Sequence, residues 1–466
     1  MQNLALSTIS TNHIDEISSS KNEPGWLKEY RKNSLSIYQA LPLETSPLYN
    51  KYTDAKRMDP EQVSLAINSD KSVPDFLTNR LLELANEISI VQIGSNIHKI
   101  NLPDEFQKKG LVISSIDDAL KNHSDIIQKT LESTNSNEDK YTALNNAAFN
   151  SGIFIHIPRN LILEKPIHIV SSLSIDGTST ISRNVIVTEE SSKASIVQEL
   201  YAPKCSHQQA YLELLNVSVG QNSQLDGTTL QVMDNSAVNF STRKSDIAQD
   251  GKINWYLGLF GTMLSRYRVE YYLNGTGATV NDSEVVFGNN DQSFDLTTNV
   301  THEKPATEGK VIEKSILKDN SKSLFKGMIR IKEHASKSNS YLSGRSILLD
   351  KGAKSESIPG LEIFTNDVKA THSASVAQID EEQIFYLQTR CLSRGESERI
   401  IVEGFLEPLS RTMSYQVRAW IAYLIESKWK GRDMSIKNDE QLKALVEVEE
   451  TRYDENAEIE QHYKYR

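Results

Sequence analysis

Histidine and cysteine are the side chains of this chain with the most informative chemistry, because both bind transition metals. The sequence contains ten histidines and two cysteines. His372 lies in the segment DVKATHSAS, after the last strand-like run and before a C-terminal helical pattern. An imidazole at such a junction can bind a metal or carry a proton near neutral pH. We therefore interpret His372 as a candidate functional residue.

Neither cysteine has enough neighbouring ligands to form a metal site alone. Cys205 and His207 make a Cys-x-His pair, which supplies too few ligands for a stable site. Cys391 follows a short predicted helix and is explained as a small residue at a helix end. Two cysteines also exclude a disulfide framework and a four-cysteine metal site within the chain.

Several function classes are excluded by missing motifs and by charge. The sequence has no GxxxxGK[ST], GxSxG, HExxH or CxxC motif, so it lacks the signatures of P-loop, hydrolase and zinc-protease chemistry. Acidic residues outnumber basic residues by 62 to 51, giving a net charge of −11, which argues against nucleic-acid binding. No segment predicts a membrane span or a signal peptide. We expect a soluble, cytoplasmic protein.

The middle of the chain predicts many short strands. Runs such as IFIHI, NVIVTE, RVEYYL and GMIRIKE recur about every 8–12 residues, separated by Asn, Gly, Asp and Ser. No helical pattern alternates with them, which argues against a doubly wound α/β sheet. The region is long for one β-sandwich, whereas a β-helix accommodates the length because each coil needs only its neighbours.

Helical periodicity flanks this region on both sides. Before it, apolar residues recur at helical spacing, and a polar segment, LESTNSNEDK, predicts a linker. After it, Asp380 with Gln383 and Ser393 with Glu396 resemble capping boxes. The expected domains are a helical N-terminal domain (1–130), a β-helix core (131–370), a helical C-terminal domain (371–430) and an acidic tail (431–466).

Two segments resemble a known family. The stretch IPGLEIFTNDVKATHSASVAQIDEEQIFYLQTRCLSRGESERIIVEGFLEPL (358–409) is similar to the C-terminal signature of the SufB/SufD family of iron–sulfur cluster assembly proteins. EPGWLKEYRKNSLSIYQALPL (23–43) resembles the family's N-terminal pattern. One departure is Cys391, where the pattern has glycine. The resemblance implies a mainly β protein, with a right-handed parallel β-helix core between helical N-terminal and C-terminal domains.

The resemblance also implies a function and partners. Family members are non-catalytic scaffolds that work with the ATPase SufC, which hydrolyses the ATP, usually as a complex of SufB, SufD and SufC. A transient iron–sulfur cluster is expected at the interface with a SufB-type paralogue, and none is expected to be held stably by this chain alone. No nucleic-acid or membrane partner is implied, and the chain alone could form a homodimer.

Two positions favour a SufD-like member, and a third departs from the SufD pattern. Gly344 stands where SufB-like chains place a cysteine, and Ser373 follows His372 where SufB has glutamate. Ala370 replaces the cysteine found in many SufD relatives two residues before the histidine. By resemblance, His372 is a candidate interface ligand for a nascent cluster. The candidate SufC-docking face comprises Phe385, Tyr386, Ile401 and Phe405.

Other interpretations remain open from sequence alone. A SufB-like paralogue could hold a nascent cluster through Cys205 or Cys391. A β-helix carbohydrate-active enzyme, such as a pectate-lyase-like protein, is less favoured because such enzymes are usually secreted and need clustered Asp, Lys and Arg. A purely structural β-helix, with His372 as an ordinary turn residue, is the third alternative.

Overall fold

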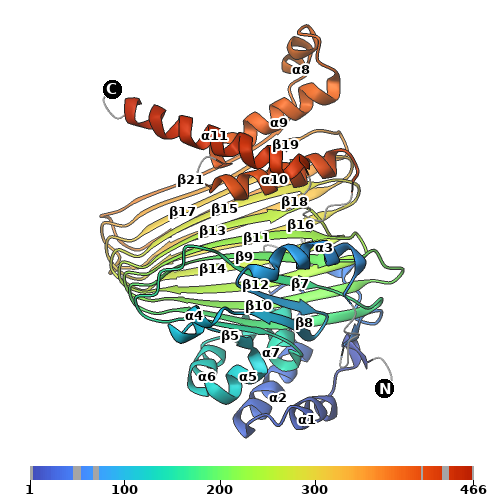
Figure 1. The fold of residues 1–466 in the computed structure, drawn as a ribbon, viewed down its shortest axis with the longest axis vertical. Coiled ribbons are helices and arrows are strands. Elements are labelled where there is room, and N and C mark those ends of the chain that lie inside the picture. Colours follow the sequence, from blue (N-terminus) through green and yellow to red (C-terminus); the bar gives the residue numbers. More distant parts are fainter. Residues whose placement is uncertain (1–3, 46–53, 67–72, 411–412, 433–439, 464–466) are drawn as a thin grey trace.

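The chain forms a parallel β-helix with helical regions at both ends, so the predicted fold class is confirmed (Figure 1). The computed structural model describes residues 4–45, 54–66, 73–410, 413–432 and 440–463. The β-helix has about eight turns, and each turn contributes one strand to each of two long sheets. None of the helices in the described ranges is long and apolar enough to cross a membrane.

The two sheets are built from alternate strands of the chain. The main strands of the first sheet are β8 (Thr178–Thr188), β10 (Gln209–Val219), β12 (Ala237–Ile247), β14 (Leu264–Leu273), β16 (Ser293–His302), β18 (Lys322–Ile331) and β20 (Lys354–Ile363). Those of the second are β7 (Ile167–Ser172), β9 (Lys193–Ala202), β11 (Gln224–Met233), β13 (Lys252–Leu259), β15 (Thr279–Gly288), β17 (Glu308–Leu317), β19 (Asn339–Leu348) and β21 (Lys369–Gln378).

All of these strands pair in parallel, and the number of residues per coil varies. The step between paired residues ranges from 26, between Val238 and Leu264, to 32, between Lys322 and Lys354. Alternate side chains point into the coil, where each inward row rests on the row before it. Leu342 of β19 and Phe325 of β18 are inward residues of this kind, exposed by 0% and 1%. Covering one such side chain stabilises the fold by about 1.5–3 kcal/mol.

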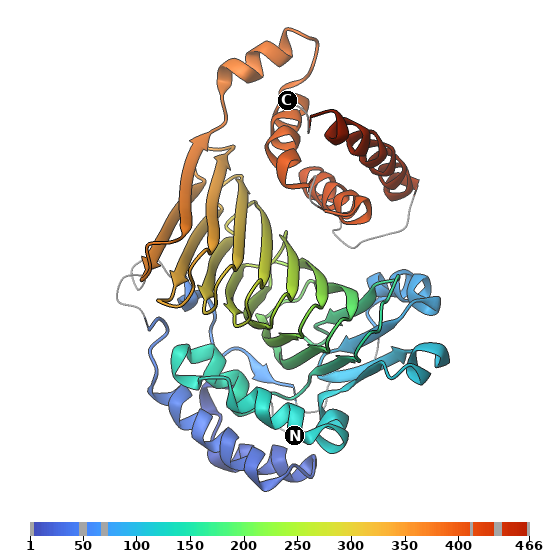
Figure 2. The ribbon, with the colours of Figure 1, turned by 90° about the vertical axis from the view of Figure 1, so that its left-hand side faces the viewer.

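Helices and short strands close the N-terminal end of the β-helix (Figure 2). The helices are α1 (Thr11–Ser20), α2 (Gly25–Ala40), α3 (Asp75–Glu83), α4 (Asp104–Lys108), α5 (Ile116–Asn122), α6 (Ser124–Glu132) and α7 (Lys140–Ala148), with 3-10 turns η1 (Leu6–Thr8), η2 (Ala55–Arg57), η3 (Leu84–Asn86) and η4 (Ser136–Glu138). The strands are β1 (Leu4–Ala5), β2 (Ser64–Leu65), β3 (Ser89–Ile93), β4 (Asn96–Asn101), β5 (Val112–Ser115) and β6 (Ile153–Ile157).

The first 130 residues are therefore not helical throughout. β3 and β4 extend the second sheet beyond β7, with Ile90 of β3 in register with Ile169 of β7. A buried ion pair holds α3 against the same sheet, because the guanidinium of Arg80 lies 2.5 Å from the carboxylate of Glu199. That guanidinium keeps the pKa of the Glu199 carboxyl far below its usual range in spite of burial.

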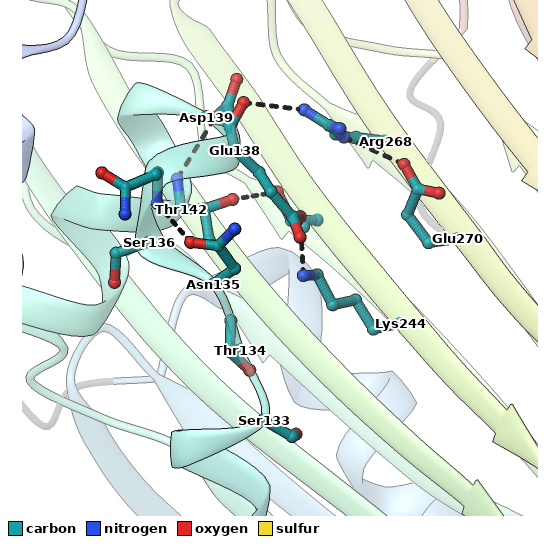
Figure 3. Close-up of polar contacts among 12 residues, drawn as sticks. Ser133, Thr134, Asn135, Ser136, Glu138, Asp139, Thr142, Lys244, Arg268 and Glu270 are labelled. Carbon is teal, nitrogen blue, oxygen red and sulfur yellow. Dashed lines mark hydrogen bonds and ion pairs between the residues drawn. The ribbon is translucent and has the colours of Figure 1, made fainter.

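The segment predicted as a linker is instead docked onto the outer face of the first sheet (Figure 3). Glu138 accepts a hydrogen bond of 2.7 Å from Lys244, and its carbonyl oxygen accepts one of 3.1 Å from Arg268. The Asp139 carboxylate accepts from Arg266 at 2.7 Å and from two backbone N–H groups that begin α7. The polar composition that predicted a linker reflects these contacts with the sheet.

Four helices follow the last strand: α8 (Glu381–Gln388), α9 (Arg394–Ser410), α10 (Tyr415–Trp429) and α11 (Glu440–Tyr463). α8 and the start of α9 project from the body as an arm (Figures 1 and 2). α10 packs on the outer side of the second sheet, where Leu424 joins a buried cluster with Phe287 and Ile316. The buried ion pair between Arg418 and Glu449, 2.5 Å long, joins α10 to α11.

Candidate functional site

The last coil of the β-helix is open on its outer side. β20 pairs only with β18 and β21 pairs only with β19, and no described strand or helix pairs with their far edges. Most residues of β21 are exposed, whereas most of β17, two coils earlier in the same sheet, are buried. The last coil therefore presents two free strand edges and an uncovered inner face, which is a template for pairing with another chain.

His372 lies on this uncovered inner face. In the register of the second sheet it is the neighbour of Leu342, a fully buried inward residue of β19. His372 therefore belongs to an inward row, yet its side chain is exposed because no coil follows. The described residues contain no group of three or more His, Cys, Asp or Glu side chains that could hold a metal. The imidazole is thus exposed at the open end of the β-helix.

The position expected to hold a cysteine in SufB-like chains, Gly344, is packed tightly. A Cβ atom added at Gly344 would lie 2.5 Å from Cδ1 of Phe325 and 2.7 Å from Oγ of Ser357. A larger side chain therefore requires the Phe325 ring to move. Gly344 pairs with Ala374 of β21, so this tight contact lies directly under the row that contains His372.

Exposed apolar side chains accompany the histidine on the last coil. Ile363 is 42% exposed, Phe364 is 58% exposed and Val376 is 44% exposed. The counterpart of Ile363 one coil earlier, Ile331, is fully buried. Single exposed apolar residues are ordinary on protein surfaces, but a group of them beside free strand edges indicates an interface.

Hydroxyl groups fix β21 from its outer face. The Ser373 hydroxyl donates a hydrogen bond of 2.9 Å to Ser343 and lies 3.1 Å from the hydroxyl of Tyr341. Hydrogen bonds of the Tyr341 hydroxyl, first with Ser343 and then with Ser373, lower the pKa of Tyr341. Because Ser373 is the chain neighbour of His372, this cluster holds the backbone that positions the imidazole.

The four residues predicted to dock the ATPase do not share one environment. Phe385 and Tyr386 on α8 are 69% and 58% exposed. Ile401 and Phe405 on α9 are half-buried and contact the buried cluster beneath α10. The ammonium of Lys314 lies 4.8 Å from the centre of the Phe405 ring. The structure thus places two of the predicted residues on the surface of the arm and two at its base.

The arm begins with helix caps at the two predicted positions, of which the Ser393–Glu396 pair forms the full capping box. The Asp380 side chain accepts from the backbone N–H of Glu382 at 2.9 Å. The Ser393 N–H donates to the Glu396 carboxylate at 2.8 Å, which begins α9. Arg394 joins the two helices through an ion pair of 2.7 Å with Glu381.

Both cysteines are free and far from forming a metal centre in the described residues. Burial, followed by the charges of Asp176 and Asp234, raises the pKa of the Cys205 thiol, which disfavours the thiolate that a metal needs. Cys391 is exposed and has a φ of +65°. That left-handed conformation suits glycine, which explains why the family pattern has glycine at this position.

The sequence predicted His372 as a candidate site residue but did not predict the exposed apolar residues around it. Phe364 and Val376 lie inside the segment that resembles the family, so their apolar character was visible. What the sequence did not show is that no further coil covers them. The end of the strand pattern near Gln378 was the available signal.

Comparison with known proteins identifies the family over most of the chain. The SUF system FeS cluster assembly, SufBD core domain, matches residues 170–405, and the SufBD protein N-terminal region matches residues 23–169. Two similar relatives are iron–sulfur cluster assembly SufBD family proteins. The one from Staphylococcus aureus (strain USA300) is 25% identical over 439 residues, covering 91% of this chain and 93% of the relative. That of Staphylococcus saprophyticus is 24% identical, with the same coverage. The chain belongs to the SufBD family of iron–sulfur cluster assembly proteins.

Proposed function

We propose that this chain is a SufD-like scaffold subunit of a cytoplasmic SufBCD complex. It pairs with a SufB-type paralogue and docks a SufC-type ATPase, which hydrolyses the ATP, while the chain itself catalyses no reaction. The observation that supports this proposal most strongly is the open last coil, which carries His372 on its inner face beside exposed apolar residues.

In this proposal the nascent cluster is bound transiently at the interface between the two subunits, as the product being assembled and not as a resident cofactor. Iron in such clusters is bound by thiolate and imidazole, and the last coil provides one imidazole and no cysteine. The SufB-type subunit therefore supplies the thiolate ligands. Ala370 faces the same inner side as His372, so the thiolate found there in many SufD relatives is replaced by a small apolar group.

The packing of Gly344 supports the SufD-like role over the SufB-like alternative. A cysteine at this position would collide with Phe325 and Ser357, and Cys205 lies elsewhere, in the turn after β9. Family membership also favours the scaffold over a carbohydrate-active enzyme.

The arm of α8 and α9 is the proposed ATPase-docking element. Phe385 and Tyr386 provide exposed aromatic side chains, and a shallow cavity of about 380 Å³ between the helices is lined by residues that include Tyr386, Leu387 and Ile401. β21 ends at Gln378 and α8 begins at Glu381. A displacement of the arm by the ATPase is therefore transmitted directly to the strand that carries His372.

Co-expression with the SufB and SufC homologues of the same organism tests the proposal. We expect the three chains to co-elute as one complex in size-exclusion chromatography with light scattering. After anaerobic iron and sulfide addition, His372→Ala should form the complex but lose cluster-dependent absorbance, whereas His334→Ala, which changes another exposed histidine, should retain it. Elution of the chain alone, or unchanged cluster formation in His372→Ala, would contradict the proposal.

Docking of the ATPase is tested separately with two aromatic residues of the arm. Phe385→Asp should abolish SufC binding and leave the melting temperature unchanged, because the side chain is exposed. Phe405→Asp should lower the melting temperature, because that ring packs at the base of the arm. If a folded Phe385→Asp variant still binds SufC, Phe385 of α8 is not part of the docking face.

A further inference from the structure

A cavity of about 420 Å³ lies beside the β-helix, and none of its described lining residues belongs to the last coil. Its floor is formed by the successive turns that follow β9, β11, β13 and β15. Phe76 of α3 forms one wall, and the end of α10, from Lys428 to Arg432, forms another. The volume lies within the range of small-molecule sites, about 300–1,000 Å³. The site is therefore assembled from both ends of the chain.

The charge of this cavity is opposite to that of the whole chain. Lys204, Lys428 and Arg432 line it, and Asp234 is the one carboxylate among its described lining residues. Oδ1 of Asp234 accepts hydrogen bonds from the N–H and the hydroxyl of Ser236 at 2.9 and 2.8 Å, so it is used within its own turn. A positive cavity in a chain of net charge −11 attracts anions.

The amino group of Lys428 lies beside the cavity and is already fully hydrogen-bonded within the protein. Its ammonium is buried and donates to the carbonyl oxygens of Phe260 and Phe287 and to Oε1 of Gln292. All three N–H bonds are thereby used. Burial lowers the pKa of Lys428 well below its usual value, and the charge of Asp319 opposes this effect. An anion in the cavity would favour the protonated form of Lys428.

Other groups on the rim can contact an anion directly. Lys204 is exposed, and within the described residues it makes no ion pair. Asn235 accepts from Gln292 through its oxygen at 2.6 Å, which leaves its NH₂ group as a donor. Arg432 donates through Nη1 to Gln441, and its other guanidinium N–H groups have no partner among the described residues. Lys204, Asn235 and Arg432 line the cavity from the turns and from the end of α10.

Aromatic side chains provide an apolar part of the same cavity. Phe76 lies with its ring centre 5.9 Å from that of Tyr201, at an interplanar angle of 57°. Phe260 lies deeper and is fully buried. Phe76 is partly buried and lines the cavity, and an aromatic side chain there can stack on a flat ring.

We propose that this cavity binds a small molecule that carries a phosphate group and a flat ring, about the size of a mononucleotide. Lys204, Asn235 and Arg432 contact the phosphate, Lys428 stabilises its charge, and Phe76 stacks on the ring. The C-terminal end of α10 adds about half a negative charge, which is smaller than the excess of basic side chains. The site is separate from the cluster interface and does not depend on the SufD-like assignment.

The test uses AMP as the probe, with pyrophosphate and adenosine as its separate parts. Isothermal titration calorimetry of the full chain at low salt should show one AMP site, with weaker binding of pyrophosphate and still weaker binding of adenosine. AMP binding should weaken as ionic strength rises. The absence of AMP and pyrophosphate binding at millimolar concentration would overturn the proposal, as would equal affinity for adenosine and AMP.

Variants locate the binding to this cavity. Lys204→Ala and Arg432→Ala should each weaken AMP binding about tenfold, the usual effect of removing one charged donor. Asn235→Asp keeps the acceptor for Gln292 and adds a negative charge, so it should abolish binding without unfolding the chain. Lys351→Ala, at an exposed lysine outside the cavity, is the matched control. Binding that is unchanged in all three cavity variants would overturn the proposed location.

Discussion

β17 and β21 are ten-residue strands of the same sheet that differ in what covers them. In β17 the inward residues Val311, Glu313 and Ser315 are at most 1% exposed. In β21 the inward residues, including His372 and Val376, are exposed. The difference shows that the presence of a following coil, rather than the strand pattern, decides whether an inward side chain is core or surface.

The comparison also explains how polar groups behave in the two places. Inside the middle coils, the carboxyl of Asp282 accepts from Tyr271 at 2.6 Å and that of Glu284 from Thr298 at 2.5 Å. Glu284 is in register with Glu313 on the next coil. Burial raises the pKa of Asp282 to about 7 and of Glu313 to about 8. These buried carboxyl groups keep their protons to a higher pH than exposed ones do, whereas the His372 side chain is exposed to solvent.

The largest expected effect on stability comes from introducing an aspartate at an inward position, first in a covered coil and then in the open last coil. Leu342→Asp buries an unpaired carboxylate in the core and should cost more than about 4 kcal/mol, enough to prevent folding. Val376→Asp should change the free energy of unfolding by less than about 0.5 kcal/mol and abolish pairing with the partner chain. Circular dichroism melting and light scattering measure the two outcomes. Equal destabilisation by both variants would contradict the conclusion that a following coil decides whether an inward side chain is buried.

A smaller effect is expected from the buried acid of β17. The folded pKa of Glu313 lies above its usual value, so the folded state binds more protons and stability falls as pH rises from about 4.5 to about 8. Glu313→Gln should remove this loss. At pH 8.5 it should stabilise the chain by a few kcal/mol, since each pKa unit corresponds to about 1.4 kcal/mol, and at pH 4.5 the difference should disappear.

The matched control for this pH effect is Glu308→Gln, on the same strand but exposed. It should leave the dependence of chemical denaturation on pH unchanged. A Glu313→Gln variant with the same pH dependence as the unmodified chain would show that Glu313 is ionised inside the coil.

The smallest effect is expected at Cys391, at the arm that follows the open coil. Its φ of +65° costs a residue with a Cβ atom about 1–2 kcal/mol relative to glycine, partly offset by the greater freedom of glycine in the unfolded chain. Cys391→Gly should therefore stabilise the arm by about 0.5–1 kcal/mol. Slower amide hydrogen exchange in α8 and α9 would measure this gain, and Cys391→Ala, which keeps the Cβ atom, should show none.

Local structure was predictable where the signal lies in neighbouring residues. Runs such as RVEYYL form strands, and the Ser393–Glu396 pair begins α9 as the capping pattern predicts. The fold class followed from the density of such runs. His372 was named as a candidate because it was expected after the last strand, whereas the structure places it within β21.

Pairing between distant segments was not predictable in the same way. The coil length varies from 26 to 32 residues, so no sequence repeat reveals the register. β3 pairs with β7, from Ile90 to Ile169, across a long insertion. A glutamate such as Glu313 is normally expected on the surface. Its burial here depends on a hydrogen bond from Ser315 and on a raised pKa, which the sequence pattern does not show. The cavity beside the β-helix is lined by α3, four turns and the end of α10. These segments are far apart in the sequence, so no local pattern predicts the cavity.

The free edges of β20 and β21 have a consequence for the cell as well as for the complex. An uncovered strand edge beside apolar side chains recruits any compatible strand, including the same edge of a second copy. Copies made in excess of the partner would therefore stack on one another or be removed by proteolysis. If the proposed pairing with a SufB-type chain holds, the amount of this chain in the cell should follow the amount of that partner.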